Sequence, residues 1–142
     1  MADDAALVKL LKDRDLGVLA TLKRDGRPQL SNVNYHYDED RRLVRVSVTA
    51  DRAKTRNLAR DPRASLHVSA ADGWSYTVAE GTAELSAVAA DPHDEVVEEL
   101  IEVYRDIRRA EHPDWDDYRR AMVADRRLVV RLHVERLYGI GR

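Results

Sequence analysis

Hydrophobic and polar residues alternate with a period of two in several stretches of the chain, and this pattern predicts β-strands. In residues 42–49, for example, three valines alternate with one arginine and two hydroxyl residues. Asp25-Gly26 is typical of a tight hairpin turn, and Gly81 predicts a bulge or bend within a long strand. The predicted strands span residues 16–23, 28–37, 42–49, 63–70, 74–87 and 127–136.

Other stretches carry apolar residues every three or four positions, which is the period of an amphipathic helix. The predicted helices span residues 3–14, 52–60, 94–109 and 114–124. Asp3 or Asp4 can cap the first of these helices, and Thr49 or Asp51 can cap the second.

Six antiparallel strands joined mostly by hairpins, with one helix after the third strand and a helical insert before the last, predict an α+β fold. The connections and the even spacing of the strands favour a sheet curled into a small barrel with peripheral helices. A doubly wound parallel sheet is not expected, because strands and helices do not alternate regularly. A chain of 142 residues is long enough for one core, so we expect one domain over residues 1–142.

The composition changes this picture only by exclusion. The chain is 44% hydrophobic and 35% charged with a formal net charge of −2, so no general attraction to nucleic acid or to an anionic membrane is expected. It contains no cysteine, which excludes disulfides, thiolate metal sites and cysteine nucleophiles. No apolar run approaches the roughly 20 residues of a membrane span, and the first residues lack a signal-peptide pattern. We therefore expect a cytoplasmic protein.

No residue pattern predicts a catalytic group or a metal site. The five histidines are not spaced as zinc ligands, and His36, His67 and His133 fall within predicted strands, where a structural role is expected. The glycine-rich phosphate-binding motifs and the serine-hydrolase motif are absent from the sequence. A binding surface remains as the more informative feature.

Three cations, Arg52, Lys54 and Arg56, fall in the first turns of the predicted helix 52–60. The helix dipole places partial positive charge at this end, so cations are unfavourable there unless an anion binds. Backbone N–H groups, hydroxyls and cationic side chains together suit a phosphate. The alternative is a solvated helix face on which Asp51 and Asp61 neutralise the cations.

Uncharged polar residues lie on the neighbouring strands. Ser47 and Thr49 share a strand face that leads into the cationic helix start, and Gln29, Ser31 and Asn32 lie in an uncharged run of the strand before it. Amides and hydroxyls in this arrangement suit a polar heterocycle or a sugar-like chain. A solvated sheet face is the alternative.

Trp74 and Tyr76 share one face of the predicted strand 74–87. Aromatic residues placed in this way pack in a core more often than they form a platform for a ligand ring. Both interpretations are kept at this stage.

A set of motifs covering nearly the whole chain resembles the split β-barrel flavin/deazaflavin oxidoreductases. More narrowly, it resembles actinobacterial enzymes that depend on coenzyme F420, within the pyridoxamine-phosphate-oxidase-like class. The motifs are residues 17–21, 25–32, 52–58, 61–64, 72–76, 78–82, 116–119 and 125–127.

This resemblance implies a six-stranded, FMN-binding-like split β-barrel that forms a homodimer with the cofactor at the subunit interface. It implies that Arg52, Lys54 and Thr55 hold the cofactor phosphate together with Ser47. It also implies four further cofactor contacts. These are Gln29 and Asn32 near the ring and ribityl chain, Trp74 near the cofactor, and Arg126 near the cofactor tail or the opposite subunit.

The function implied is hydride transfer between coenzyme F420 and a small organic molecule. A 5-deazaflavin is a two-electron hydride carrier, so most of the chemistry belongs to the cofactor and the protein supplies binding and orientation. The alternatives are an FMN-dependent enzyme that oxidises a substrate like pyridoxamine 5′-phosphate, or a protein that carries F420 without turnover. No side chain is identified from the sequence as a proton donor.

Overall fold

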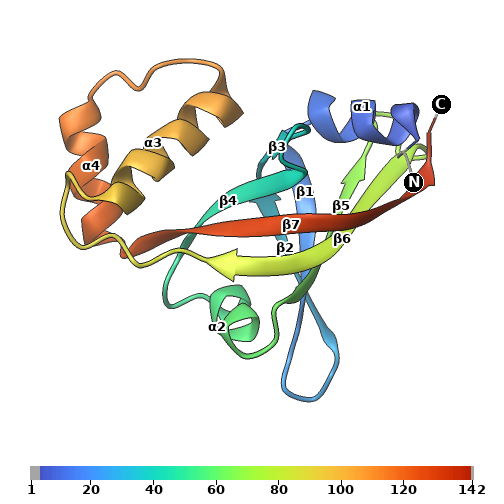
Figure 1. Cartoon of the computed structure of the whole chain (residues 1–142), viewed down its shortest axis with the longest axis horizontal. Helices are drawn as coiled ribbons and strands as arrows, with labels where there is room; N and C mark the ends of the chain where they lie inside the picture. The colour runs from blue at the N-terminus through green and yellow to red at the C-terminus, as the bar shows by residue number, and fades with distance from the viewer. Residues whose placement is uncertain (1–3, 142) are drawn as a thin grey trace.

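The computed structural model describes residues 4–141 and contains one curled antiparallel sheet with helices at its ends and on one outer face (Figure 1). The sheet has seven strands in the order β2-β1-β5-β6-β7-β4-β3. The predicted α+β class is therefore confirmed. The elements are α1 (Ala5–Asp13), β1 (Leu16–Leu22), β2 (Pro28–Asn34), β3 (His36–Asp38), β4 (Leu43–Thr49), α2 (Ala53–Arg60), β5 (Arg63–Ser69), β6 (Tyr76–Leu85), α3 (Glu95–Arg108), α4 (Trp115–Ala124) and β7 (Arg127–Ile140).

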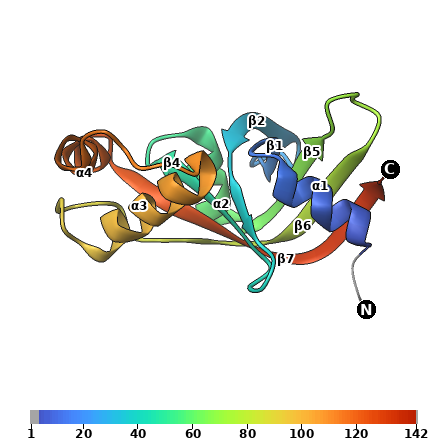
Figure 2. The ribbon, with the colours of Figure 1, turned by 90° about the horizontal axis from the view of Figure 1, so that it is seen from above.

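The two edges of the sheet, β2 and β3, are consecutive in the chain and separated only by Tyr35. The backbone N–H of Tyr35 donates to the carbonyl of Asp15, and its buried hydroxyl donates to the carbonyl of Leu11 at 2.6 Å. The chain leaves β1 at this point and pairs with β4 from His36 onwards. The prediction of one strand over 28–37 is therefore wrong, and the sheet has seven strands instead of six. The bend curls the sheet into a half-open barrel (Figure 2).

The barrel interior is filled by the inward-facing residues of the strands, as the period-two pattern requires. Helices α1 and α2 contribute Leu11 and Leu58 to this core. A second hydrophobic cluster joins α3 and α4 to the outer face of β7 through Val129. The helical pair α3–α4 therefore lies outside the barrel, against β4 and β7 (Figure 1).

The predicted bulge at Gly81 is confirmed. The register between β6 and β7 shifts between Glu80 and Gly81. A Cβ atom at Gly81 would lie 1.9 Å from the carbonyl oxygen of His133, so only glycine allows the two strands to approach this closely.

Helix α2 begins one residue later than predicted, and neither expected residue caps it. Its N-cap is Arg52, which makes no capping hydrogen bond through its side chain, because Thr49 is still within β4 and Asp51 lies in the exposed turn between the two elements. Asp4 caps α1 by accepting from the N–H of Ala6, whereas Asp3 lies outside the described residues. No helix within residues 4–141 has the length and apolar character needed to span a membrane.

Candidate functional site

A pocket of about 600 Å³ lies where β2, β4, the start of α2 and the α3–α4 pair meet. One side of it is polar and comes from the barrel and α2. The other side comes from α3 and α4 and is largely apolar. The polar lining residues are Ser31, Asn32, Asn34, Ser47, Thr49, Arg52, Lys54, Arg108 and Arg127, and the others include Val103, Tyr104, Ile107, Tyr118 and Met122.

The polar side carries an excess of positive charge. Four cations line the pocket, and none of the described residues that line it is an aspartate or a glutamate. Burial is the largest cause that lowers the pKa of Lys54 below its ordinary value, and the charges of Arg52 and Arg127 lower it further. Burial and the two arginines therefore disfavour the charged form of Lys54. A bound anion would favour that charged form.

Arg127, which the sequence analysis did not select, completes the cationic group. It pairs in register with Thr49, and its Nη1 lies 3.5 Å from the hydroxyl oxygen of Ser47. Its Nε is buried and has no hydrogen-bond partner. A buried donor left unpaired in a pocket is available to a ligand.

Arg126, the residue selected from the sequence, is exposed and does not line the pocket. It occupies the turn before β7 with a left-handed φ of 52°. Because strand residues alternate between faces, Arg127 shares its face with Val129 under the helices. The alternation of side chains between the two faces of the strand could therefore have identified Arg127 from the sequence.

The hydroxyl of Ser31 is a second buried group without a hydrogen-bond partner. Asn32 and Asn34 follow it along the edge strand β2 and also line the pocket. These amides and hydroxyls can donate to or accept from the edge of a polar ring. The structure thus brings together Asn32, Ser47, Arg52 and Lys54 at one pocket, as the sequence analysis expected of a single site.

The opposite wall is stiffened by packed aromatic rings. Tyr104, His112, Trp115 and Tyr118 have ring centroids 5.2–5.6 Å apart. The Tyr118 hydroxyl donates to the carbonyl of Leu100 at 3.0 Å, and burial raises its pKa to about 12. Tyr118 is therefore engaged and neutral at physiological pH, and it provides shape instead of a proton.

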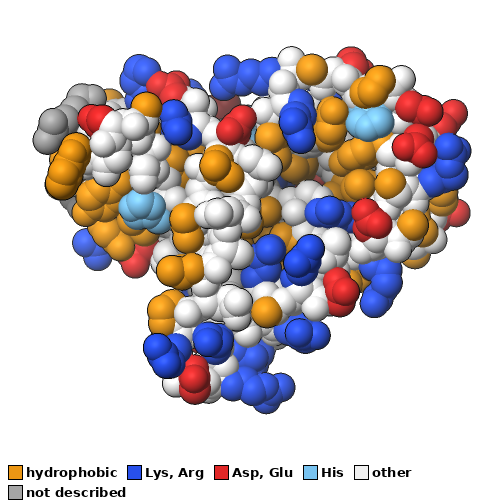
Figure 3. Space-filling model, turned by 180° about the vertical axis from the view of Figure 1, so that it is seen from behind, with side chains coloured by type: hydrophobic (Ala, Val, Ile, Leu, Met, Phe, Trp, Pro, Cys, Tyr) orange, Lys and Arg blue, Asp and Glu red, His pale blue; other side chains and the backbone are white. Residues whose placement is uncertain are grey.

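Besides Arg126, three predicted contacts do not line this pocket. Gln29 lines a separate groove on the other side of α2, between that helix and the β1–β2 hairpin. Cations gather at this end of the molecule in Figure 3. The Thr55 hydroxyl is not free, because it donates to the carbonyl of Thr49 at 2.8 Å and so joins α2 to β4.

Trp74 is the third. It lies in the turn between β5 and β6, before β6 begins at Tyr76, and it is 74% exposed. The prediction that Trp74 and Tyr76 alternate on one strand is therefore wrong, because the strand begins later. The turn between β5 and β6 lies at the end of β5 that is remote from α2 (Figure 1), and Trp74 does not line the pocket of its own chain.

Comparison with known proteins places this geometry in context. Residues 3–141 match the family model described as pyridoxamine 5′-phosphate oxidase. A conserved hypothetical protein from Mycobacterium tuberculosis has a similar structure, with a TM-score of 0.75, 22% identity, and coverage of 99% of this chain and 86% of that chain.

Two further solved structures share the fold. An F420 reductase has a TM-score of 0.68 and 22% identity, with coverage of 96% of this chain and 98% of that chain. A heme-binding protein from Mycobacterium smegmatis has a TM-score of 0.66 and 23% identity, with coverage of 99% of this chain and 56% of that chain. At these identities the solved structures establish a shared fold and nothing finer.

Proposed function

Because the chain belongs to the pyridoxamine 5′-phosphate oxidase family, we propose that it is an oxidoreductase that binds the deazaflavin coenzyme F420 and transfers a hydride between F420 and a small organic molecule. The observation that carries this proposal is the pocket, whose lining among the described residues includes four cations and no carboxylate. The similarity in fold to an F420 reductase gives it a second, weaker support.

The residues fit a phosphorylated cofactor. Lys54 and Arg127 lie together, the Nε of Arg127 is unpaired, and the Ser47 hydroxyl is 3.5 Å from the Arg127 guanidinium. No acidic residue occupies the first turn of α2 and no side chain caps it, so the dipole of this helix also favours an anion. We assign the phosphate to Arg52, Lys54, Arg127 and Ser47.

The remainder of the pocket suits a planar ring. Ser31 and Asn32 present hydrogen-bonding groups from β2, and Tyr104, Ile107 and Met122 form the apolar wall opposite. The apolar wall keeps water from the ring and holds a substrate against it. When bound, a 5-deazaflavin supplies a ring carbon that carries the hydride.

We further propose that the protein is a homodimer with the pocket at the interface. The outer face of β2, β1, β5, β6 and β7 exposes large apolar residues that the strand register places on one side: Leu16 at 55%, Leu30 at 63%, Tyr138 at 40% and Ile140 at 51%. Such a face is typical of a protein–protein contact. Asn32 pairs with Val18 on this face and also lines the pocket, so a second copy would extend the site. The exposed Trp74 would then reach the partner's cofactor.

Titration of the purified protein with F420 and with FMN, followed by quenching of tryptophan fluorescence, tests the cofactor. We expect micromolar binding with preference for F420. Lys54→Ala removes a charge-assisted contact and should weaken binding by about 1.5–3 kcal/mol, or roughly 10- to 150-fold. Lys9→Ala is the matched control, because Lys9 is an exposed lysine on α1 that pairs with Asp13.

Absence of binding to either cofactor contradicts the proposal, and equal loss in both lysine variants shows that the phosphate lies elsewhere. Protein that purifies yellow and prefers FMN would assign the pocket to an FMN-dependent enzyme of the same family.

One observation favours a second function, transport or storage of the cofactor without turnover. None of the described residues that line the pocket is a histidine, aspartate or glutamate, and Tyr118 is engaged by Leu100. Reduced F420 that binds tightly but stays reduced across a panel of quinones, enones and nitro compounds would support this carrier. Oxidation by any of them supports the enzyme.

A further inference from the structure

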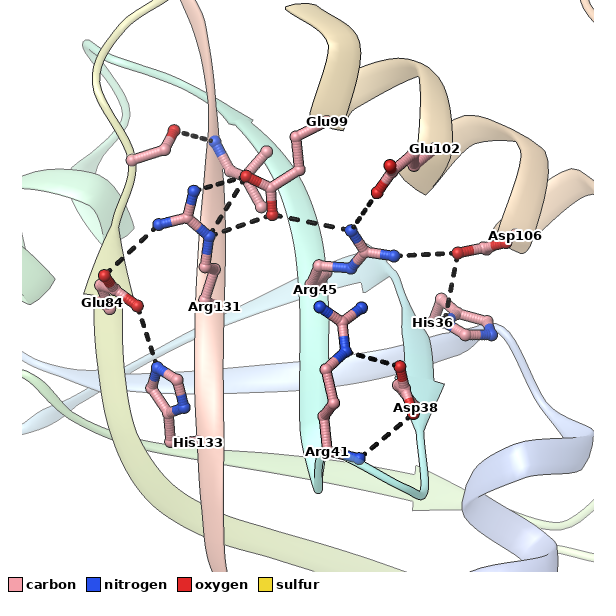
Figure 4. A network of polar contacts seen from close by, with 12 residues as sticks. His36, Asp38, Arg41, Arg45, Glu84, Glu99, Glu102, Asp106, Arg131 and His133 are labelled. Atoms are coloured by element: carbon pink, nitrogen blue, oxygen red, sulfur yellow. Dashed lines mark hydrogen bonds and ion pairs between the residues drawn. The ribbon is translucent and has the colours of Figure 1, made fainter. Parts of the chain in front are cut away.

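A network of charges joins helix α3 to the outer face of the barrel (Figure 4). Arg45 of β4 is 3% exposed, and its guanidinium lies 3.1 Å from Glu102 and 2.9 Å from Asp106. Arg131 of β7 binds Glu99 through Nε at 3.0 Å and Nη2 at 2.5 Å. Burial alone would raise the pKa of Glu99, but the hydrogen bond and charge of Arg131 lower it below its ordinary value. The network therefore holds α3 by its charged face.

The same helix forms the wall of the pocket with its other face. Val103, Tyr104 and Ile107 line the pocket, and Asp106 lies among them in sequence. A shift of the last turns of α3 would change the pocket directly. The contact between Arg45 and Asp106 joins this part of α3 to β4.

His36 of β3 lies at one end of this network. Its Nδ1 is 3.8 Å from the carboxylate of Asp106, which is too far for a hydrogen bond, and this buried nitrogen has no hydrogen-bond partner. Burial is the largest influence on the pKa of His36 and lowers it, while Asp106 opposes this effect. Several charged groups surround His36 or line the same hollow. They are Asp106, Arg108 and Arg109 at the end of α3, Arg45 of β4, Asp38 of β3, and Lys12, Asp13, Arg14 and Asp15 around the end of α1.

We propose that Arg45 and Asp106 are positioning residues for the pocket wall, and that protonation of His36 disturbs their contact and loosens the wall. A protonated His36 would add a cation beside Arg45 and Arg109 and would compete with Arg45 for the Asp106 carboxylate. Its effect on cofactor affinity rests on the proposed function, whereas its effect on the helix does not.

The sign follows from the lowered pKa. In the closed arrangement α3 is packed against the sheet, and in the open one the pocket wall is loosened. A base whose pKa is lower in the closed arrangement than in the open one takes up a proton when the wall opens. The closed arrangement is therefore fully favoured above the ordinary histidine pKa of about 6.5. That preference is lost as the pH falls below this value.

Fluorescence of Trp115 reports the helix position without any cofactor. Trp115 packs on Tyr104, and the Arg105 guanidinium lies 5.0 Å from its ring. The chain has two tryptophans, so Trp74→Phe leaves Trp115 as the sole probe. In that background we expect the emission to change as the pH falls from 8 to 5, and His36→Gln to abolish the change. His133→Gln is the matched control, because His133 is exposed, contacts Glu84 and lies at the other end of the network (Figure 4).

His112 also contacts Trp115, with ring centroids 5.6 Å apart. A pH transition that persists in His36→Gln does not come from His36 and overturns the proposal. Loss of the transition in His36→Gln, with retention in His133→Gln, supports it.

A second measurement uses F420 with the otherwise unaltered chain. Affinity should fall at least threefold from pH 7.5 to 5.5 in the parent, and Asp106→Asn and His36→Gln should remove most of this pH dependence. Tight binding with identical pH profiles in all three overturns the inference and leaves the proposed function intact. No binding at any pH, with the Trp115 transition as expected, overturns the proposed function and leaves the inference intact.

Discussion

Two groups of cations meet at the strand pair β4–β7, at positions four residues apart along the strands. Only one of the two groups is paired with carboxylates. Arg45 and Arg131 are opposite each other in the β4–β7 register and meet Glu99, Glu102 and Asp106. Thr49 and Arg127 are opposite each other further along, where Arg127 joins Arg52 and Lys54. No carboxylate is among the described residues that line the pocket around this second group.

The difference separates structural charge from charge available for binding. A buried cation that serves the fold is supplied with counterions by the fold itself, because an unpaired buried charge is strongly unfavourable. A cation that serves a ligand is left unmatched, and its perturbed pKa marks the site. The type of charge in each group alone would not distinguish these roles, since both groups consist of arginine or lysine side chains that meet at β4 and β7.

The largest expected effect is on the matched group. Arg45→Ala leaves Glu102 and Asp106 without their arginine partner, while Glu99 keeps Arg131, and should lower the free energy of unfolding by about 3 kcal/mol. This value is at the low end of the stability loss that follows removal of one partner from a buried ion pair, because Glu102 and Asp106 are 64% and 40% exposed. Urea denaturation of the cofactor-free protein measures this, and a loss below about 1 kcal/mol would show that the network adds little to stability.

The second effect concerns ligand linkage at the unmatched group. F420 at a free concentration of 100 times its dissociation constant should raise the free energy of unfolding by about 2.7 kcal/mol. At that same concentration the gain should shrink to below about 1.4 kcal/mol in Lys54→Ala, if its affinity falls tenfold or more. Urea denaturation with and without F420 checks both values, and an equal gain in the two proteins would place the cofactor away from Lys54.

The smallest effect has the opposite sign to that of Arg45→Ala. Lys54→Met in the cofactor-free protein removes the repulsion from Arg52 and Arg127 and keeps an apolar stem of similar length. We expect the free energy of unfolding to stay unchanged or to rise by up to about 1 kcal/mol. Destabilisation comparable to that of Arg45→Ala would show that Lys54 serves the fold, and the contrast between the two groups would be lost.

Much of the fold follows from local pattern. Apart from the single strand predicted over 28–37, the strands, the four helices and the bulge at Gly81 were predicted to within a few residues at their ends, because side-chain period and glycine placement act over short distances. The convergence of Ser47, Arg52 and Lys54 was also predictable, since these residues are close in sequence across one strand–helix junction. The uncharged polar run on the neighbouring strand likewise identified Asn32 as a residue of this site.

Contacts between distant segments were less accessible. Nothing local shows that Tyr35 ends one strand and begins another at the opposite edge of the sheet. The selection of Arg126 over Arg127 failed for a related reason, since the register with β4 decides which of two adjacent arginines faces Ser47. The placement of Trp74 depended on where β6 begins.

The amino-acid sequence by itself determined the fold class, the strand periods and the cationic start of α2, because each of these is written in residues that are neighbours along the chain. Only the tertiary structure decided which cations are paired with carboxylates and which are left for a ligand. The carboxylates of α3 lie more than fifty residues from Arg45 in sequence, and charge pairing over such a separation is set by how the sheet closes and where the helical pair packs.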